Sequence, residues 1–133
     1  MYENTVDVPK GLWNKSNTLK YSIPVTDTIA YYNIILSMRN NNNYPYSNIC
    51  LFVDTRSPKG IAKRDTIELE LCDDKGKWYG KGLGGIWQNK VYFKKNIRFP
   101  NSGIYIIGIT QAMRDENLEG IIDTGIKIEQ FSK

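Results

Sequence analysis

The sequence predicts an all-β fold, an antiparallel β-sandwich of Ig-like or jelly-roll type with about seven to nine strands. Short apolar or alternating segments recur along the 133-residue chain, and turn signals rich in Gly, Pro, Asn or Ser separate them. No stretch of useful length shows the ~3.6-residue apolar period of an amphipathic helix. Because no linker-like segment interrupts the pattern, we expect residues 1–133 to form a single domain.

The first two predicted strands are short. Tyr2–Val8 ends at Pro9, which has no N–H to donate to a neighbouring strand. Leu19–Val25 alternates apolar and polar residues, which predicts one buried and one solvated face. Pro24 places this second segment at a sheet edge or near a strand end. Between them, Trp13 begins a polar stretch.

The next two segments are more apolar. Ile29–Arg39 is rich in β-branched and aromatic residues and is predicted to be a strand. Asn40–Asn43 follows it and predicts a turn, because asparagine accepts positive φ and bonds its own backbone. Ile49–Asp54 is apolar on both faces, as expected for a strand in the middle of a sandwich sheet.

Two further strands flank a glycine-rich stretch. Thr66–Leu71 shows the clearest alternation in the chain, with its isoleucine and leucines directed inward. Val91–Phe99 is apolar on one face, but Lys95 interrupts that face.

The C-terminal part predicts two last strands, Ile104–Met113 and Ile121–Phe131. Gly108 inside the first of them marks a bulge or a close backbone approach. In the second, Ile122 is expected to share a face with the later isoleucines. Arg114–Gly120 between the two strands is predicted to be a polar loop or one short helical turn.

Composition excludes several classes of site. Histidine is absent, which excludes Ser-His-Asp and Cys-His catalysis from this chain alone. With only two cysteines, a four-ligand Cys/His zinc site is excluded as well, and we expect no metal or cofactor. The net charge of +4 arises from 18 basic residues spread among 14 acidic ones, so no dense basic stripe suggests nucleic acid. Cys50 and Cys72 are either a cross-strand disulfide or, as we favour, buried free thiols.

The candidate binding residues concentrate in Asp73–Trp87, which holds Trp78, Tyr79, Trp87 and five of the 11 glycines. Aromatic side chains on such a loop stack against sugar rings or anchor protein interfaces. The alternative, which we favour, is that the two tryptophans plug the open end of the sandwich.

A second candidate surface combines Tyr44 and Tyr46, which flank a rigid proline, with the turn Arg56–Lys59. Turn chemistry explains both segments equally well. Glu68 and Glu70 share a face, but they alternate along a solvated strand, so we do not expect a catalytic carboxylate pair.

Five segments, taken in order, form a recognisable pattern: YPYSNICLFVDT (44–55), DTIELELCD (65–73), GKWYGKGLGGIW (76–87), KKNIRFPNSGIYIIGITQAMR (94–114) and LEGIIDTGIKIE (118–129). The G-K-W-x-G-x-G-L-G and Q-A-M-R runs are its most specific parts. This pattern, from about Val8 to Glu129, resembles the GldH family of gliding-motility lipoproteins of Bacteroidetes. The family pattern often has an acidic residue after G-L-G, where this chain has Gly85, so no ligand role of that acid is carried over.

The resemblance implies an exported, non-enzymatic protein of the cell envelope, held at the outer membrane by a lipid on an N-terminal cysteine. Its implied partners are other envelope proteins of a motility or secretion complex. The lipidated cysteine and a leader are not found in residues 1–133, and the start Met1–Asn4 lacks the charged and apolar regions of a signal peptide. From the residues alone, the chain is therefore either cytoplasmic or the mature portion of an exported protein. The alternative function is a carbohydrate-binding module that uses the loop aromatics, with a glycan as ligand.

Overall fold

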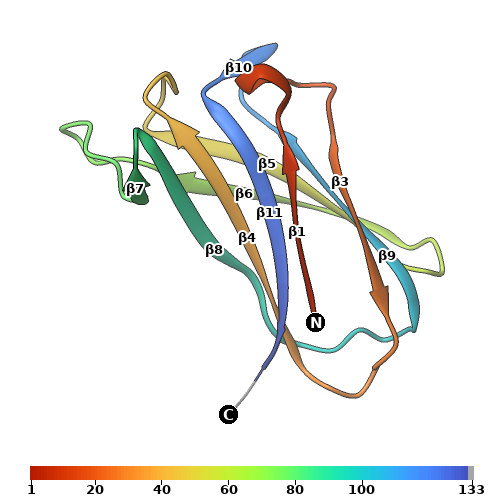
Figure 1. The fold of residues 1–133 in the computed structure, drawn as a ribbon. Coiled ribbons are helices and arrows are strands. Elements are labelled where there is room, and N and C mark those ends of the chain that lie inside the picture. The colour runs from red at the N-terminus through yellow and green to blue at the C-terminus, as the bar shows by residue number, and fades with distance from the viewer. Residues whose placement is uncertain (132–133) are drawn as a thin grey trace.

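The computed structural model describes residues 1–131, and these form a β-sandwich of antiparallel strands, which confirms the predicted fold class (Figure 1). Eleven strands are present in this part of the chain, more than predicted, because three of them have only three residues. The strands are β1 (Tyr2–Asp7), β2 (Leu12–Asn14), β3 (Leu19–Val25), β4 (Tyr32–Asn41), β5 (Asn48–Arg56), β6 (Ala62–Glu70), β7 (Lys81–Leu83), β8 (Ile86–Ile97), β9 (Gly103–Gln111), β10 (Asn117–Glu119) and β11 (Ile121–Gln130). A 3-10 turn, η1 (Pro9–Gly11), joins β1 to β2.

The order of the strands identifies the sandwich as a jelly roll. One sheet has the order β1-β11-β4-β8-β7, and the other has the order β3-β9-β5-β6. Without the three-residue strands, eight strands remain, and they can be numbered 1 to 8 in chain order. One sheet then has the order 1-8-3-6 and the sheet facing it has the order 2-7-4-5. The chain thus crosses repeatedly between two four-stranded layers, as two nested Greek keys require. Of the two predicted sandwich types, the jelly roll is the one observed.

The core lies between the sheets and takes apolar side chains from both. Its fully buried members include Ile23, Leu51 and Ile109 from one sheet and Leu36 and Ile128 from the other. A buried hydrogen bond also joins the layers, because the Tyr21 hydroxyl on β3 donates to the Thr124 carbonyl oxygen on β11 at 2.6 Å. Burial raises the pKa of Tyr21 to about 12, so this phenol stays protonated at neutral pH.

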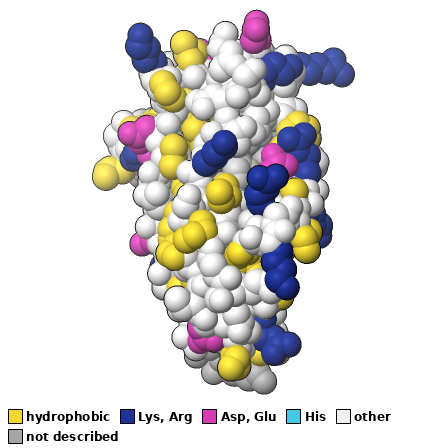
Figure 2. All heavy atoms as spheres, turned by 90° about the vertical axis from the view of Figure 1, so that its right-hand side faces the viewer, with side chains coloured by type: hydrophobic (Ala, Val, Ile, Leu, Met, Phe, Trp, Pro, Cys, Tyr) yellow, Lys and Arg dark blue, Asp and Glu magenta, His cyan; other side chains and the backbone are white. Residues whose placement is uncertain are grey.

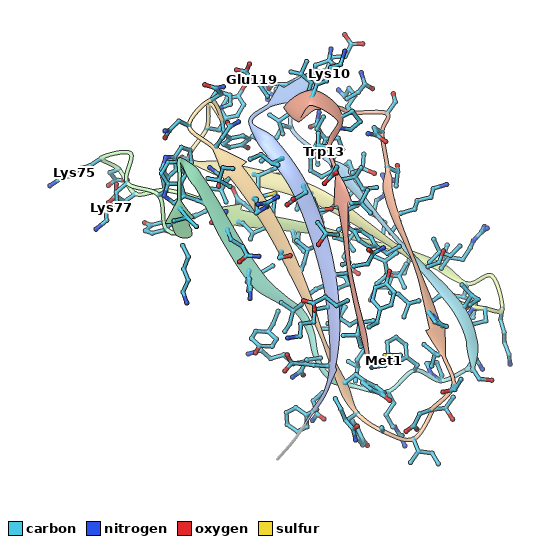
Figure 3. All side chains as sticks on the ribbon, viewed as in Figure 1. Met1, Lys10, Trp13, Lys75, Lys77 and Glu119 are labelled. Carbon is cyan, nitrogen blue, oxygen red and sulfur yellow. The ribbon has the colours of Figure 1, made fainter. Side chains whose placement is uncertain are left out.

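One end of the sandwich is closed by β2 and β10, which pair as a separate two-stranded sheet. Trp13 on β2 and Leu118 on β10 are both fully buried, at 0% exposure. The Trp13 indole points into the fold from this end and donates to the Asn17 carbonyl oxygen at 2.8 Å (Figure 3). Two predictions were therefore wrong: Trp13 does not begin a polar stretch, and residues 114–120 contain a strand and not only a loop.

The predictions for the second sheet were largely right. β3 is an edge strand with an exposed Pro24, as its proline indicated. β5 lies inside its sheet, but only one of its faces is fully buried, since Cys50 and Phe52 are half-exposed on the outer face. The prediction of two buried faces was wrong. Gly108 is a close approach: an added Cβ there would lie 2.7 Å from Thr18 Cγ2.

Three irregularities in the first sheet shift residues from their predicted places. β4 continues through the predicted turn as far as Asn41, and the buried Asn40 Oδ1 accepts a 2.9 Å hydrogen bond from Asn89 Nδ2. A register shift in β11 puts Ile121 in the core in place of the predicted Ile122. Register shifts between β4 and β8 turn Lys95 outward. Lys95 therefore does not lie on the apolar face of β8, where the sequence had placed it.

The two cysteines, Cys50 and Cys72, are free and half-buried. Cys50 lies opposite Glu68 in the sheet, and Cys72 forms an isolated bridge with Trp78. The favoured prediction of free thiols is thus confirmed, whereas their full burial was wrong.

On the face shown in Figure 2, most Lys and Arg side chains lie along the right-hand side, with apolar and acidic side chains among them. Within residues 1–131, no helix has the length and apolar character needed to cross a membrane.

Candidate functional site

Residues 72–87, here called the tryptophan hairpin, carry the chain from the end of β6 in one sheet to β7 and β8 in the other. The segment first reverses at residues 73–76, where Asp73 Oδ1 accepts hydrogen bonds from the backbone N–H groups of Lys75 (2.9 Å) and Lys77 (2.8 Å). It reverses again between β7 and β8 at Gly84 and Gly85, with φ of 62° and 78°. Two successive positive φ values are what a tight type I′ hairpin requires, and glycine adopts them without strain.

The two tryptophans pack against each other and fix this hairpin to the sandwich. Their ring centroids lie 5.5 Å apart with an interplanar angle of 32°. Trp78 is half-buried against the core, and its Nε1 donates to Asn42 Oδ1 at 3.2 Å. The Trp87 indole occupies the space beside Gly82, since an added Cβ at that glycine would overlap the ring. The favoured prediction that both tryptophans plug the sandwich holds in part for Trp78, which packs against the core, whereas the fully buried tryptophan at the closed end is Trp13.

The apolar groups that remain exposed on the hairpin are Tyr79, at 60%, and Leu83, at 89%. Partial desolvation raises the pKa of the Tyr79 phenol, and so, to a smaller extent, do the negative charges of Glu70, Asp73 and Asp74. The phenol is therefore a neutral hydrogen-bond donor at physiological pH. In Figure 3, Lys75 and Lys77 mark a turn that projects away from the sandwich. A shallow, open hollow beside this turn is lined by Lys77, Trp78, Gly80, Gly82, Leu83, Gly84, Gly85 and Trp87.

The second predicted surface is divided by the structure. Tyr44 is only 4% exposed and its hydroxyl donates to the Asn48 carbonyl oxygen at 2.6 Å, so it belongs to the core. Tyr46 is 39% exposed and donates to Asp115 Oδ1 at 2.7 Å, and this bond raises the pKa of the Tyr46 phenol. The turn Arg56–Lys59 lies at the other end of β5, so the two predicted loops do not meet.

Tyr46 and the tryptophan hairpin occupy the same end of the molecule. The Ser47 carbonyl oxygen accepts hydrogen bonds from the backbone N–H groups of Leu71 (2.7 Å) and Cys72 (3.3 Å), just before the hairpin. The bond from Trp78 to Asn42 joins the hairpin to the same loop between β4 and β5. The structure thus places Tyr46 at the same end of the molecule as the hairpin, where its ring packs edge-on against the buried Tyr44 with the centroids 6.0 Å apart.

A second feature of the surface was not predicted. The outer face of the five-stranded sheet is hollowed around Gly125, where residues of β1, β4, β8 and β11 meet. A glycine inside a strand is a signal of close approach to another group, and this signal was available in the sequence. It was noted at Gly108 but not at Gly125.

Comparison with known proteins agrees with the resemblance found in the sequence. The family model described as GldH lipoprotein matches residues 1–128. A gliding motility lipoprotein GldH of Flavobacterium johnsoniae is 37% identical over 125 residues, which cover 89% of this chain and 77% of the relative. A gliding motility lipoprotein GldH homolog of Christiangramia forsetii is 34% identical over 125 residues, with the same two coverages. This chain therefore belongs to the GldH lipoprotein family.

Proposed function

We propose that this chain is the single sandwich domain of a lipid-anchored protein of the cell envelope, and that it works by binding another protein and not by catalysis. The proposed setting is the gliding-motility machinery or its counterpart in a species that does not glide. The names of the two relatives, gliding motility lipoprotein GldH and its homolog, support this setting. The proposed anchor is a lipid on a cysteine outside residues 1–133, inserted in the outer membrane.

The observation that carries the proposal is the tryptophan hairpin. Its backbone is held by the glycine turn and the Trp78–Trp87 contact, while Leu83 and Tyr79 are presented to solvent on a rigid support. Interfaces between proteins commonly have such apolar and aromatic anchors at their centre and charged side chains at their rim. Lys77 and Lys81 are exposed next to these anchors and supply such a rim.

The same geometry favours a protein partner over a sugar at this surface. A sugar ring stacks on an open aromatic face, but Trp78 and Trp87 pack against each other and Trp78 also packs against the core. The surface that protrudes is formed by Leu83 and Tyr79, which is suited to insertion into an apolar pocket of a partner.

The arrangement of the carboxylates supports a role without catalysis. Asp123, the carboxylate that is most buried, is bound by Arg39, whose Nε and Nη2 both donate to Asp123 Oδ2, at 2.9 Å and 2.5 Å. Glu68 accepts a hydrogen bond from Asn48 Nδ2 at 2.6 Å on an exposed face. The most buried carboxylate thus has a structural partner, and Glu68 lies with Glu70, Asp73 and Asp74 along a solvent-open hollow and not in a buried cleft.

The test is site-specific photo-crosslinking in cells that express the full-length protein. A photo-crosslinking amino acid replaces Leu83 in one variant and Ile104 in the control, which is 51% exposed on the outer face of the other sheet. We expect a discrete crosslinked species with an envelope protein at position 83, none at position 104, and its loss in a Tyr79→Ala background.

Equal crosslinking at the two positions, or none at either, would remove the hairpin as the binding surface. The anchor is tested separately by fractionating the same cells. If the full-length protein is found in the cytosol, the proposed location is wrong. The crosslinking result, which tests the binding surface, is not affected by that outcome.

A further inference from the structure

The hollow on the outer face of the five-stranded sheet has a volume of about 320 Å³. Its floor is a row of directly opposed residues in four strands: Thr5 on β1, Gly125 on β11, Ser37 on β4 and Lys90 on β8. Small-molecule sites in proteins commonly occupy ~300–1,000 Å³, so this hollow is at the small end of that range. It is open to solvent along the sheet, so a longer ligand can extend beyond it.

The hollow exists because residue 125 has no side chain. A Cβ built on Gly125 would lie 2.5 Å from Ser37 Oγ and 3.3 Å from Thr5 Oγ1. An alanine side chain would therefore have to displace the Ser37 hydroxyl, and it would occupy the floor of the hollow. Gly125 lacks a positive φ, so backbone conformation does not require glycine here.

The polar side chains around this space have no partner within the protein. Thr5, Ser37 and Gln88 line the hollow, and none of their side chains forms a hydrogen bond among the described residues 1–131. On the outer face of the other sheet, by contrast, Arg64 donates to both oxygens of Asp54, at 2.7 Å and 3.1 Å. On the outer face of the four-stranded sheet, these polar side chains thus bond to each other. On the outer face of the five-stranded sheet, the donors and acceptors around the hollow are directed at solvent.

The charges at the hollow cancel. Lys90 and Lys127 oppose Glu3 and Glu129 along its lining, and these four residues form no ion pair within the described part of the chain. A site with two cations and two anions has no net attraction for an ionic ligand. It does offer many charge-assisted donors and acceptors, which are the stronger kind of hydrogen bond.

An aromatic wall completes the site. Tyr92 on β8 is 49% exposed and lines the hollow next to Ile35. Lys95 Nζ lies 4.7 Å from the centroid of the Tyr92 ring, which helps to hold the ring in place. Tyrosine combines a flat apolar face with a polar hydroxyl, so it packs against a ligand that has both apolar and hydroxyl surfaces.

From this combination we propose that the outer face of the five-stranded sheet binds a neutral glycan chain, with one sugar unit seated over Gly125 between Thr5, Ser37 and Tyr92. Sugars present hydroxyl groups that donate and accept at once, together with apolar C–H faces, and they carry no charge. The hollow matches each of these properties. This site is separate from the tryptophan hairpin and does not depend on the protein partner proposed above.

The experiment is isothermal titration calorimetry of the 133-residue chain with four neutral hexasaccharides: maltohexaose, cellohexaose, laminarihexaose and chitohexaose. We expect at least one to bind with a Kd of about 1 mM or tighter. Tyr92→Ala and Ser37→Ala, at positions outside the core, should each weaken that binding at least tenfold. Gly125→Ala fills the floor and should abolish it, with a thermal melt to show that the variant is folded.

Leu83→Ala on the tryptophan hairpin is the matched control and should bind like the unaltered chain. Failure of all four hexasaccharides to bind at millimolar concentration would overturn the proposal. It would also be overturned if binding survives Tyr92→Ala and Ser37→Ala together, or if Leu83→Ala abolishes it. In the last case the sugar site would be the hairpin.

Discussion

The burial of Trp13 predicts a large and position-specific loss of stability on its removal. Trp13 is fully buried between the two-stranded sheet and the core, and its indole N–H is hydrogen-bonded. Truncation of a buried aromatic residue to alanine costs about 3–5 kcal/mol from lost transfer free energy and the cavity left behind. Domains of this kind have total stabilities of about 5–15 kcal/mol, so Trp13→Ala should bring the protein close to its unfolding threshold.

Trp87 provides the matched comparison because the residue type is the same and the burial differs. Trp87 is half-exposed and packs mainly against Trp78. Trp87→Ala should therefore cost less than half as much as Trp13→Ala. Leu83→Ala, at an 89% exposed position, should change stability by less than about 0.5 kcal/mol.

The assay is equilibrium unfolding in urea followed by far-UV circular dichroism, which does not depend on the tryptophans being removed. Trp13→Phe adds an intermediate point, since it keeps an aromatic ring but loses the bond to Asn17, worth about 0.5–1.5 kcal/mol. Equal losses for Trp13→Ala and Trp87→Ala, or a loss below 1 kcal/mol at Trp13, would show that the end of the sandwich is not closed as described.

Three further outcomes follow from the structure. Burial raises the pKa of Tyr21 from 10.0 to about 12, so the folded state holds this proton more tightly than the unfolded state. The contribution of this group to the free energy of unfolding should be constant below pH 10 and should fall by about 1.4 kcal/mol per pH unit between pH 10 and 12. Urea midpoints measured across this range should fall less steeply in Tyr21→Phe. Gly120→Ala should lower stability by at least about 1–3 kcal/mol in thermal melts, because its φ is +99° and a Cβ would overlap the Tyr44 backbone. Cys50 and Cys72 should both be alkylated by iodoacetamide in urea without reductant, whereas mass spectrometry showing an unmodified, oxidised pair would contradict free thiols.

The fold class was predictable because period-two alternation is a local property. In Leu19–Val25 each second residue is buried in the structure, as the sequence indicates. The topology was not predictable, because it depends on which strands become neighbours. Ig-like and jelly-roll sandwiches have similar alternation, and they differ in the order of their strands.

The short strands and irregularities escaped prediction for a related reason. Trp13 and Leu118 are isolated apolar residues in polar segments, and a three-residue strand is too short to show a period. Their burial results from contact between segments that are distant in sequence. A bulge shifts the buried face without any strong local signal, as Ile121 shows.

The candidate sites were predictable to different degrees. The tryptophan hairpin could be located because its aromatics and glycines are adjacent in sequence. For the hollow the only local signal was Gly125 inside a strand, since the polar residues that line it come from four separate strands. Thr5, Ser37 and Lys90 become a group only when β11 aligns β1 with β4 and β8.

The position of the last strands has a consequence for when the protein can fold. β9 lies between β3 and β5, and β11 lies between β1 and β4, so the interior of each sheet is completed by residues 103–130. Neither layer can close until almost the whole chain has been synthesised, and pairings between such distant segments form slowly. In this fold, the order of the strands itself delays folding until the C-terminal segment is available.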